Sequence, residues 1–189
     1  MWFDYKAYRE ERYKTWWNSW AWSYWENALF KADIINYLID ELKVNSWVEV
    51  GCWDWHNLWL YNFKEYLWLD VSAKAIEKCK NIYVADNSKE FKLYEPWKEK
   101  QRDMSLCLDV TYHIFPRKER EETILETVRL WKKYVLFYSF LNPSWHVKHI
   151  NDYDFKSYIT DVCAEKWYDM RIMDKKPPKS ESRFVLIIK

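Results

Sequence analysis

The chain has 189 residues, 49% of them hydrophobic, which is enough for the core of one domain. Its 30 basic residues against 29 acidic residues leave a net charge of +1, which excludes a sequence-independent attraction to nucleic acid or membranes. Charges in the opening residues MWFDYKAYREER exclude a typical signal peptide, and no apolar stretch approaches the roughly 18 residues of a membrane span. Four separated cysteines without a CxxC pair favour reduced thiols and no metal site: Cys52, Cys79, Cys107 and Cys163. We therefore expect a cytoplasmic protein.

Glycine and tryptophan occur in abnormal numbers. The chain has 1 glycine and 15 tryptophans, whereas ordinary usage of about 7% would give roughly 13 glycines in a chain of this length. The two residue types together number 16, which is close to a normal glycine content. The composition therefore suggests that tryptophan stands at positions that need glycine.

The first 27 residues are predicted to form an N-terminal segment apart from the domain at 28–189. They lack a clear period and contain six of the tryptophans. If the tryptophans at 16, 17, 20, 22 and 25 occupy glycine positions, TWWNSWAWSYWEN becomes TGGNSGAGSYGEN, a flexible loop able to fold over a ligand. An exposed aromatic patch that binds a partner is the alternative.

The first half of the domain alternates helical and strand patterns. A helix is predicted over 28–43, where apolar residues recur at spacings of three and four, namely Leu29, Ala32, Ile35, Leu38, Ile39 and Leu42. Strands are predicted at 44–50, ending before Gly51, at 65–70, and at 81–86 in NIYVAD. Ser72 can cap a helix that extends to about Lys80.

The second half continues this alternation. Strands are predicted at 104–110 and 133–140, separated by a helix from Pro116 to about Leu130. A helix at 154–166 and a hairpin formed by 168–173 and 183–188 follow. Strands alternating with helices predict a doubly wound α/β fold with a mainly parallel sheet and a C-terminal antiparallel hairpin.

The fragment VEVGCWDWHNL at 48–58 lies at the carboxyl end of the first predicted strand, where α/β sheets bind ligands. With glycine at 53 and 55 it becomes VEVGCGDGHNL, which resembles the glycine-rich loop of class I S-adenosylmethionine (SAM) methyltransferases. Dinucleotide-binding enzymes space their glycines differently, as GxGxxG. The resemblance implies a seven-stranded Rossmann-like sheet and SAM as cofactor, bound by Glu49, Gly51, Cys52, Trp53, Asp54 and Trp55. For Glu49, a buried structural carboxylate is the alternative.

Two further acids resemble cofactor ligands of this family. Asp70 ends the second predicted strand, nineteen residues after Gly51, where an acid can accept both ribose hydroxyls together with the neighbouring Val71 and Ser72. A helix cap is the alternative role for Asp70. Asp86, with Asn87, resembles the acid near the adenine amino group, and a solvated loop aspartate is the alternative.

The fragment DMSLCLDVTYHI at 103–114 resembles the fourth-strand motif of the family, which passes beneath the transferred methyl group. The resemblance implies that Asp109 lies at the cofactor and that Tyr112 and His113 face the substrate, with Ser23 and Tyr24 of the N-terminal segment. His113 is the candidate base, with pocket shaping or capping of the loop as alternatives. His146 and His149 are weaker candidates.

Methyl transfer to a small-molecule or carrier-bound acceptor is the function that the resemblance implies, with no nucleic-acid or membrane partner expected. A non-catalytic binding module with exposed aromatics is the alternative. A nucleotide-dependent oxidoreductase is a third hypothesis, which the loop spacing disfavours.

The tryptophans are not ordinary substitutions. Glycine in such loops supplies positive φ, and a bulky residue there costs about 1–2 kcal/mol per site. We hypothesise that one codon, glycine in the source's genetic code, is translated here as tryptophan, and that deliberate substitution is the alternative. Trp167 is the one position considered a genuine tryptophan. Indoles at 53 and 55 would fill the cofactor volume, so the chain as written is not expected to bind SAM.

Overall fold

The computed structural model describes residues 26–51, 57–142, 153–178 and 180–189, together with residues 4, 7, 10 and 11. The helices are α2 (Glu26–Leu42), α3 (Ala73–Ile82), α4 (Arg117–Arg129) and α5 (Phe155–Lys166), with short 3-10 turns η2 (Leu58–Leu60) and η3 (Thr111–His113). The strands are β1 (Ser46–Val50), β2 (Glu65–Asp70), β3 (Lys89–Leu93), β4 (Arg102–Leu108), β5 (Trp131–Ser139), β6 (Asp169–Ile172) and β7 (Arg183–Ile188).

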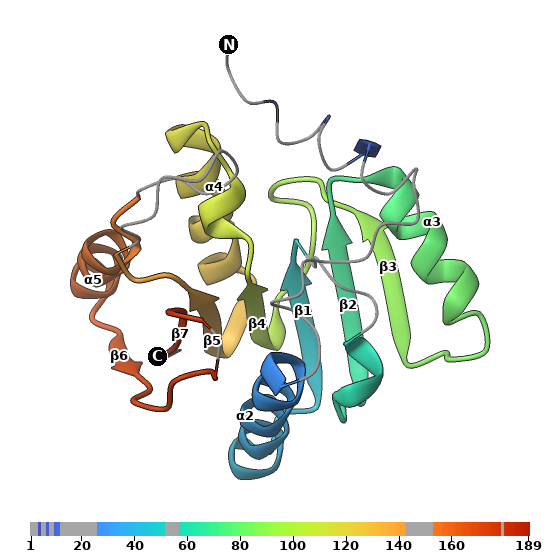
Figure 1. Cartoon of the computed structure of the whole chain (residues 1–189), viewed down its shortest axis with the longest axis horizontal. Coiled ribbons are helices and arrows are strands. Elements are labelled where there is room, and N and C mark those ends of the chain that lie inside the picture. Colours follow the sequence, from blue (N-terminus) through green and yellow to red (C-terminus); the bar gives the residue numbers. More distant parts are fainter. Residues whose placement is uncertain are drawn as a thin grey trace.

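The strands form one sheet in the order β3-β2-β1-β4-β5-β7-β6. The first five strands run parallel, and β7 pairs antiparallel with both β5 and β6. Figure 1 shows the strands side by side, with α3 next to β3 at one edge and α5 next to β6 at the other. This arrangement confirms the predicted seven-stranded, doubly wound α/β fold with its C-terminal hairpin.

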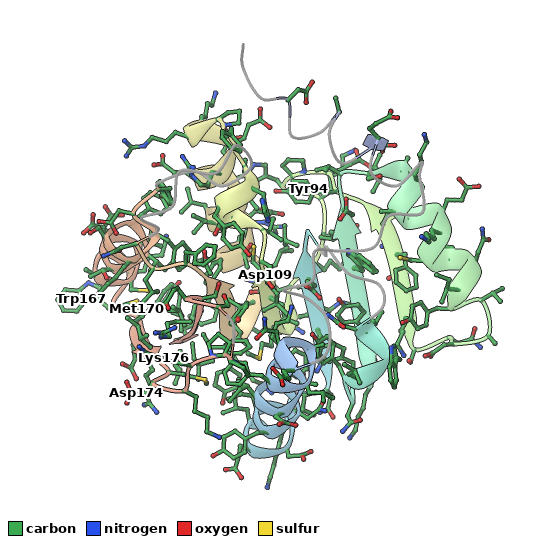
Figure 2. All side chains as sticks on the ribbon, in the orientation of Figure 1. Tyr94, Asp109, Trp167, Met170, Asp174 and Lys176 are labelled. Carbon is green, nitrogen blue, oxygen red and sulfur yellow. The ribbon has the colours of Figure 1, made fainter. Side chains whose placement is uncertain are left out.

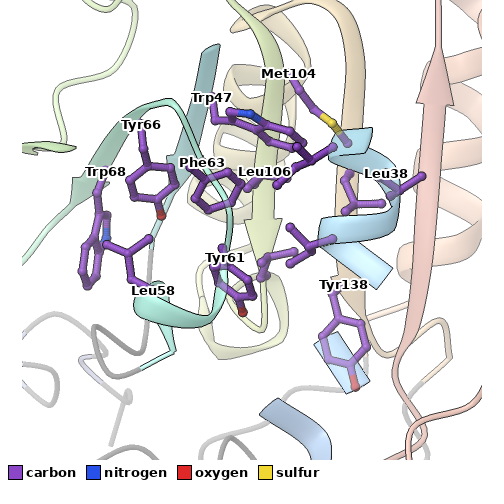
Figure 3. Packing of buried hydrophobic residues seen from close by; sticks show 14 of the residues in the cluster. Leu38, Trp47, Leu58, Tyr61, Phe63, Tyr66, Trp68, Met104, Leu106 and Tyr138 are labelled. Atoms are coloured by element: carbon purple, nitrogen blue, oxygen red, sulfur yellow. The ribbon is translucent and has the colours of Figure 1, made fainter. Parts of the chain in front are cut away.

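Each face of the sheet has its own apolar cluster. One cluster joins α2 and α3 to the sheet, and its aromatic part packs Phe63 between Trp47 and Tyr66, with ring centroids 4.8 and 4.6 Å away (Figure 3). On the other face, one cluster joins α4 and α5 to β4, β5 and β7, and a smaller one joins β1 and β2 to Leu130. Burial on both faces explains why the central strands are continuously apolar.

The described helix α2 agrees with the predicted helix at 28–43 and buries most of the predicted stripe, with two differences. Leu29, expected in the apolar stripe, is 55% exposed, whereas Lys31 is only 4% exposed. Lys31 lies four and seven residues before Ile35 and Leu38, so it occupies a stripe position despite its charge. None of the helices in the described ranges is both long and apolar enough to cross a membrane.

The strand predicted at 81–86 is wrong. Helix α3 continues to Ile82, the Tyr83 amide N–H donates to the Cys79 carbonyl (2.9 Å), and the third strand is β3. The branched residues that suggested a strand are exposed, Ile82 by 44% and Val84 by 79%. Strand β3, with the sequence KEFKL, buries only Phe91, as expected of a strand at the sheet edge, and therefore lacks an apolar run.

Candidate cofactor and acceptor site

The carboxyl ends of the parallel strands lie along one side of the sheet, called the carboxyl edge, and their amino ends lie along the opposite side, the amino edge. The Gly51 amide N–H donates to the Leu69 carbonyl (2.7 Å), and the Tyr94 amide N–H donates to the Asp70 carbonyl (2.7 Å). On the other side of β1, β4 ends at Leu108 and is followed by Asp109. The structure therefore brings Gly51, Asp70 and Asp109 to the edge where α/β sheets bind ligands.

Gly51 occupies a place that no larger residue fits. Its φ is +70°, and a Cβ built on its backbone would lie 2.8 Å from Cγ1 of Val110. A side chain here would therefore meet both an unfavourable torsion and a close contact. At Gly51 the backbone therefore requires glycine, as the resemblance to a glycine-rich loop implies.

Glu49 lies two residues before Gly51, in β1, and is buried, with 2% exposure. The Tyr66 hydroxyl of β2 donates a hydrogen bond to its Oε2. The sequence reasoning missed Tyr66, although the register that sets Glu49 opposite Trp68 leaves Tyr66 as the diagonal neighbour on the same face. Glu49 therefore has a partner inside the sheet, which agrees with its alternative role as a buried structural carboxylate.

Asp70 and Ser72 have different structural roles at the start of α3. Ser72 is the N-cap of α3, and its Oγ accepts a hydrogen bond from the Ala75 amide (3.2 Å), as predicted. Asp70 is fully buried, and its Oδ1 accepts from the Ser72 amide (2.9 Å) across Val71. Asp70 therefore shapes the turn before the helix, while Ser72 caps the helix itself.

Asp86 and Asn87 lie elsewhere. They precede β3, and because β3 runs parallel to β2 with Leu93 opposite Asp70, they stand at the amino edge of the sheet. Hydrogen bonds from Lys89 and then Ser88 hold the pKa of the Asp86 carboxyl below its usual value. The structure does not bring these two residues to Gly51, which corrects their placement beside the adenine.

The residue that does follow β3 is Tyr94, which the sequence reasoning missed. Burial raises the pKa of its hydroxyl, and Glu126 adds to this effect. Figure 2 shows Tyr94 and Asp109 on the side of the sheet toward which the arrowheads of β1 and β2 point. Recognising KEFKL as an edge strand would have indicated Tyr94.

Asp109 begins the turn that carries the acceptor-side candidates. Its φ is +59°, its Oδ2 is 2.9 Å from Lys31 Nζ, and its Oδ1 accepts a hydrogen bond from the Tyr112 hydroxyl (2.6 Å). The Tyr112 and His113 ring centroids are 4.4 Å apart. Burial, followed by the nearby Asp109 charge, raises the pKa of Tyr112 well above its usual value, so Tyr112 acts as a hydrogen-bond donor. The structure brings Asp109, Tyr112 and His113 together.

A hydroxyl pair ties this turn to β5. Thr111 Oγ1 and Ser139 Oγ are 2.8 Å apart, and both residues are buried. The Asp109 amide N–H donates to the Tyr138 carbonyl (2.9 Å), which continues the β4–β5 ladder to the start of the turn. The turn is therefore attached to β5 at Asp109 and at Thr111.

Several predicted residues lie outside the described part of the chain. They are Ser23, Tyr24, Cys52, Trp53, Asp54, Trp55, His146 and His149. Their cofactor and substrate roles stay predictions.

Neither a family model nor a curated protein sequence matches this chain. Among solved structures, it is similar to magnesium protoporphyrin IX methyltransferase from Synechocystis PCC 6803 with bound SAM, at TM-score 0.70 and 13% identity over 99% of this chain and 98% of that one. The chain has the class I methyltransferase fold.

Two other solved structures agree with this result. The N-methyltransferase NodS from Bradyrhizobium japonicum WM9, in complex with S-adenosyl-l-homocysteine, superposes at TM-score 0.72 and 13% identity over 98% of each chain. The methyltransferase domain of bacterial CtHen1 superposes at 0.67 and 12% identity, over 84% of this chain and 96% of that chain. At these identities the likeness establishes the fold alone.

Proposed function

We propose that this protein transfers a methyl group from SAM to a small-molecule or carrier-bound acceptor. The observation that carries the proposal is the carboxyl edge of the sheet, where Gly51 leaves no room for a Cβ and lies beside buried Asp70 and the Asp109 turn. A bare-backbone turn followed by an acid on the next strand fits a nucleoside with a ribose. The solved structures of this fold with bound SAM or S-adenosyl-l-homocysteine support that choice of ligand.

The residues divide between cofactor and acceptor. Gly51 would let the cofactor approach the backbone, and Asp70, with Val71 and Ser72, would face its ribose. The residues at 52–55 complete this proposed set, whereas Glu49 and Asp109 would hold the loop and turn around the cofactor. Asp86 and Asn87 are withdrawn from the set because they lie at the opposite edge.

The sulfonium of SAM supplies an already activated methyl group. The protein must then mainly orient the acceptor, and remove a proton where the nucleophile carries one. His113 follows Tyr112 in the η3 turn and is our candidate base, while Tyr112 and the N-terminal Ser23 and Tyr24 would line the acceptor side. Acceptor identity, and a cytoplasmic location, stay predictions.

Calorimetric titration separates the candidate functions. Full-length chain with glycine at the tryptophan positions is titrated with S-adenosylhomocysteine and, in parallel, with NAD. We expect micromolar binding of S-adenosylhomocysteine and none of NAD. Binding of NAD alone would favour an oxidoreductase, and binding of neither ligand would leave the non-catalytic binding module as the better description.

We also propose that tryptophan replaces glycine through codon assignment. Trp97 and Trp167 have φ of +66° and +58°. Trp167 lies just after α5, its amide N–H donates toward the Ala164 and Cys163 carbonyls, and its side chain is 94% exposed, so it has the geometry of a glycine helix cap. This geometry argues against our exception for Trp167, whose side chain points outward in Figure 2.

Two buried tryptophans have indole donors without a hydrogen-bond partner among the described residues. The indole nitrogens of Trp47 and Trp68 are buried in adjacent strands and have no hydrogen-bond partner within the described residues. A buried donor left without a partner costs about 1–3 kcal/mol. Glycine at either position would remove this donor but would also remove an indole that packs against Phe63 or Phe91, so these two positions favour neither residue.

The gene sequence tests this proposal directly. One codon shared by the tryptophan positions and different from the Gly51 codon is expected, and peptide masses of the natural protein should show glycine at 97 and 167. Several different codons at the tryptophan positions, or peptide masses that correspond to tryptophan at 97 and 167, would refute it. Restoring glycine at 53 and 55 should recover cofactor binding, whereas restoring only the N-terminal positions should not.

A further inference from the structure

A lysine of α2 reaches the carboxyl edge of the sheet through the core. Lys31 is 4% exposed, and its Nζ lies 2.9 Å from Oδ2 of Asp109, which is 78 positions later in the sequence. The ammonium is also 5.7 Å from the centroid of the Tyr138 ring. This lysine connects the helix that follows the N-terminal segment with the turn that carries His113.

Asp109 links Lys31 to Tyr112. Its two carboxylate oxygens take different partners, because Oδ2 faces Lys31 while Oδ1 accepts the hydrogen bond from the Tyr112 hydroxyl. Tyr112 in turn lies against His113 on one side and Phe140 on another, with centroids 4.4 and 4.6 Å away. A displacement of the Asp109 carboxylate would therefore change the direction of the Tyr112 ring and of His113.

The pair also fixes an unusual backbone. Asp109 has φ of +59°, a conformation that aspartate tolerates better than most residues. An ammonium buried without its anion is strongly unfavourable, so buried Lys31 holds to Asp109 once α2 packs on the sheet. A purely stabilising ion pair would need neither the Tyr112 contact nor a place beside the candidate base.

We infer that Lys31 is a positioning residue, which orients His113 through Asp109 and Tyr112. The inference rests on the proposed function for its consequence in catalysis. Its geometric part, the dependence of His113 orientation on Lys31, stands apart from the identity of the cofactor.

The test uses the full-length glycine-containing chain with isotope-labelled histidine. His113 is assigned by comparison with His113→Gln, and its imidazole resonances are compared in Lys31→Met and Lys31→Arg. Lys89→Met is the matched control, because it removes the lysine of the Asp86 pair at the opposite edge. We expect Lys31→Met to shift the His113 resonances, Lys31→Arg to restore them in large part, and Lys89→Met to leave them unchanged.

Kinetics give the second readout. Lys31→Met should lower kcat for methyl transfer at least 10-fold while changing the Kd for S-adenosylhomocysteine less than threefold. Unchanged His113 resonances in Lys31→Met would overturn the inference. If Lys31→Met does not fold, Tyr112→Phe replaces it, since this change removes only the hydroxyl on Asp109, and unchanged His113 resonances there would overturn the inference equally. Failure of the parent chain to bind S-adenosylhomocysteine would instead refute the proposed function.

Discussion

At the carboxyl edge of the sheet Asp109 pairs with a lysine 78 residues away, whereas at the amino edge Asp86 pairs with a lysine three residues away. The Asp109 side chain is 15% exposed and that of Asp86 is 36% exposed. A second amino-edge acid, Asp103, accepts hydrogen bonds from the backbone amides of Asn45 and Ser46 (3.2 and 3.3 Å). Asp86 therefore secures a local turn, Asp103 joins β4 to the start of β1, and Asp109 joins α2 to the turn that carries the candidate base.

Strand direction decides which acids reach the carboxyl edge. Asp70 and Asp86 both follow an apolar run in the sequence, and both were expected at the cofactor. Asp70 ends a strand and Asp86 precedes one, so only Asp70 reaches the edge where ligands bind.

The largest effect is expected at Gly51. Gly51→Ala should destabilise the fold by about 2–4 kcal/mol and abolish binding of S-adenosylhomocysteine, because it combines a left-handed torsion with the contact to Val110. Urea unfolding and calorimetry measure the two quantities. Val110→Ala in the same background should restore part of the stability, and equal stability of the single and parent chains would contradict the steric account.

Asp70 is the next position. Asp70→Ala should weaken binding of S-adenosylhomocysteine by about 1–3 kcal/mol, because the ribose hydroxyls lose a charged acceptor. The matched control is Asp86→Ala at the amino edge, which should leave Kd unchanged. Equal losses in the two variants would show that the edges do not differ in this respect.

His113 should separate catalysis from cofactor binding. His113→Gln should lower kcat by roughly 100-fold, the lower range for loss of a general base, with Kd for S-adenosylhomocysteine unchanged. Methyl-transfer assays quenched at fixed times measure kcat, and calorimetry measures Kd. If the cofactor affinity falls as far as kcat does, His113 contacts the cofactor or supports the fold.

The smallest effect is expected at Asp86 and concerns pH. Its pKa is lowered in the folded state, first by the hydrogen bond from Lys89, so its stabilisation is present above the unfolded pKa of about 3.9 and is lost as pH falls through the lower folded value. With a side chain 36% exposed, the stabilisation is at most about 0.5 kcal/mol. Asp86→Asn should lose this amount at pH 7 and nothing below about pH 3 in urea unfolding. If the free energy of unfolding is still lowered below about pH 3, the cause is the loss of hydrogen bonds and not the loss of the Asp86 charge.

The sequence predicts the sheet well because burial on both faces leaves clear apolar runs in β1, β2, β4 and β5. It fails at β3, where an edge strand buries a single residue. Gly51 could be singled out from the loop motif, but its contact with Val110 depends on how β1 and β4 pack.

The partners of the candidate site were harder to predict. Lys31, Tyr66 and Tyr94 meet Asp109, Glu49 and Asp70 only after folding, because those contacts cross between elements. A lysine in the apolar stripe of α2 was the one signal that sequence spacing offered. The residues at 52–55, on which the cofactor prediction depends most, lie outside the described ranges.

A crystal structure of the glycine-containing chain with S-adenosylhomocysteine tests the central claim most directly. We predict that the ligand lies across the carboxyl edge, with its homocysteine part beside Gly51 and its ribose hydroxyls within hydrogen-bond distance of the Asp70 carboxylate. Ligand bound at the amino edge near Asp86, or ribose hydroxyls without contact to Asp70, would contradict it.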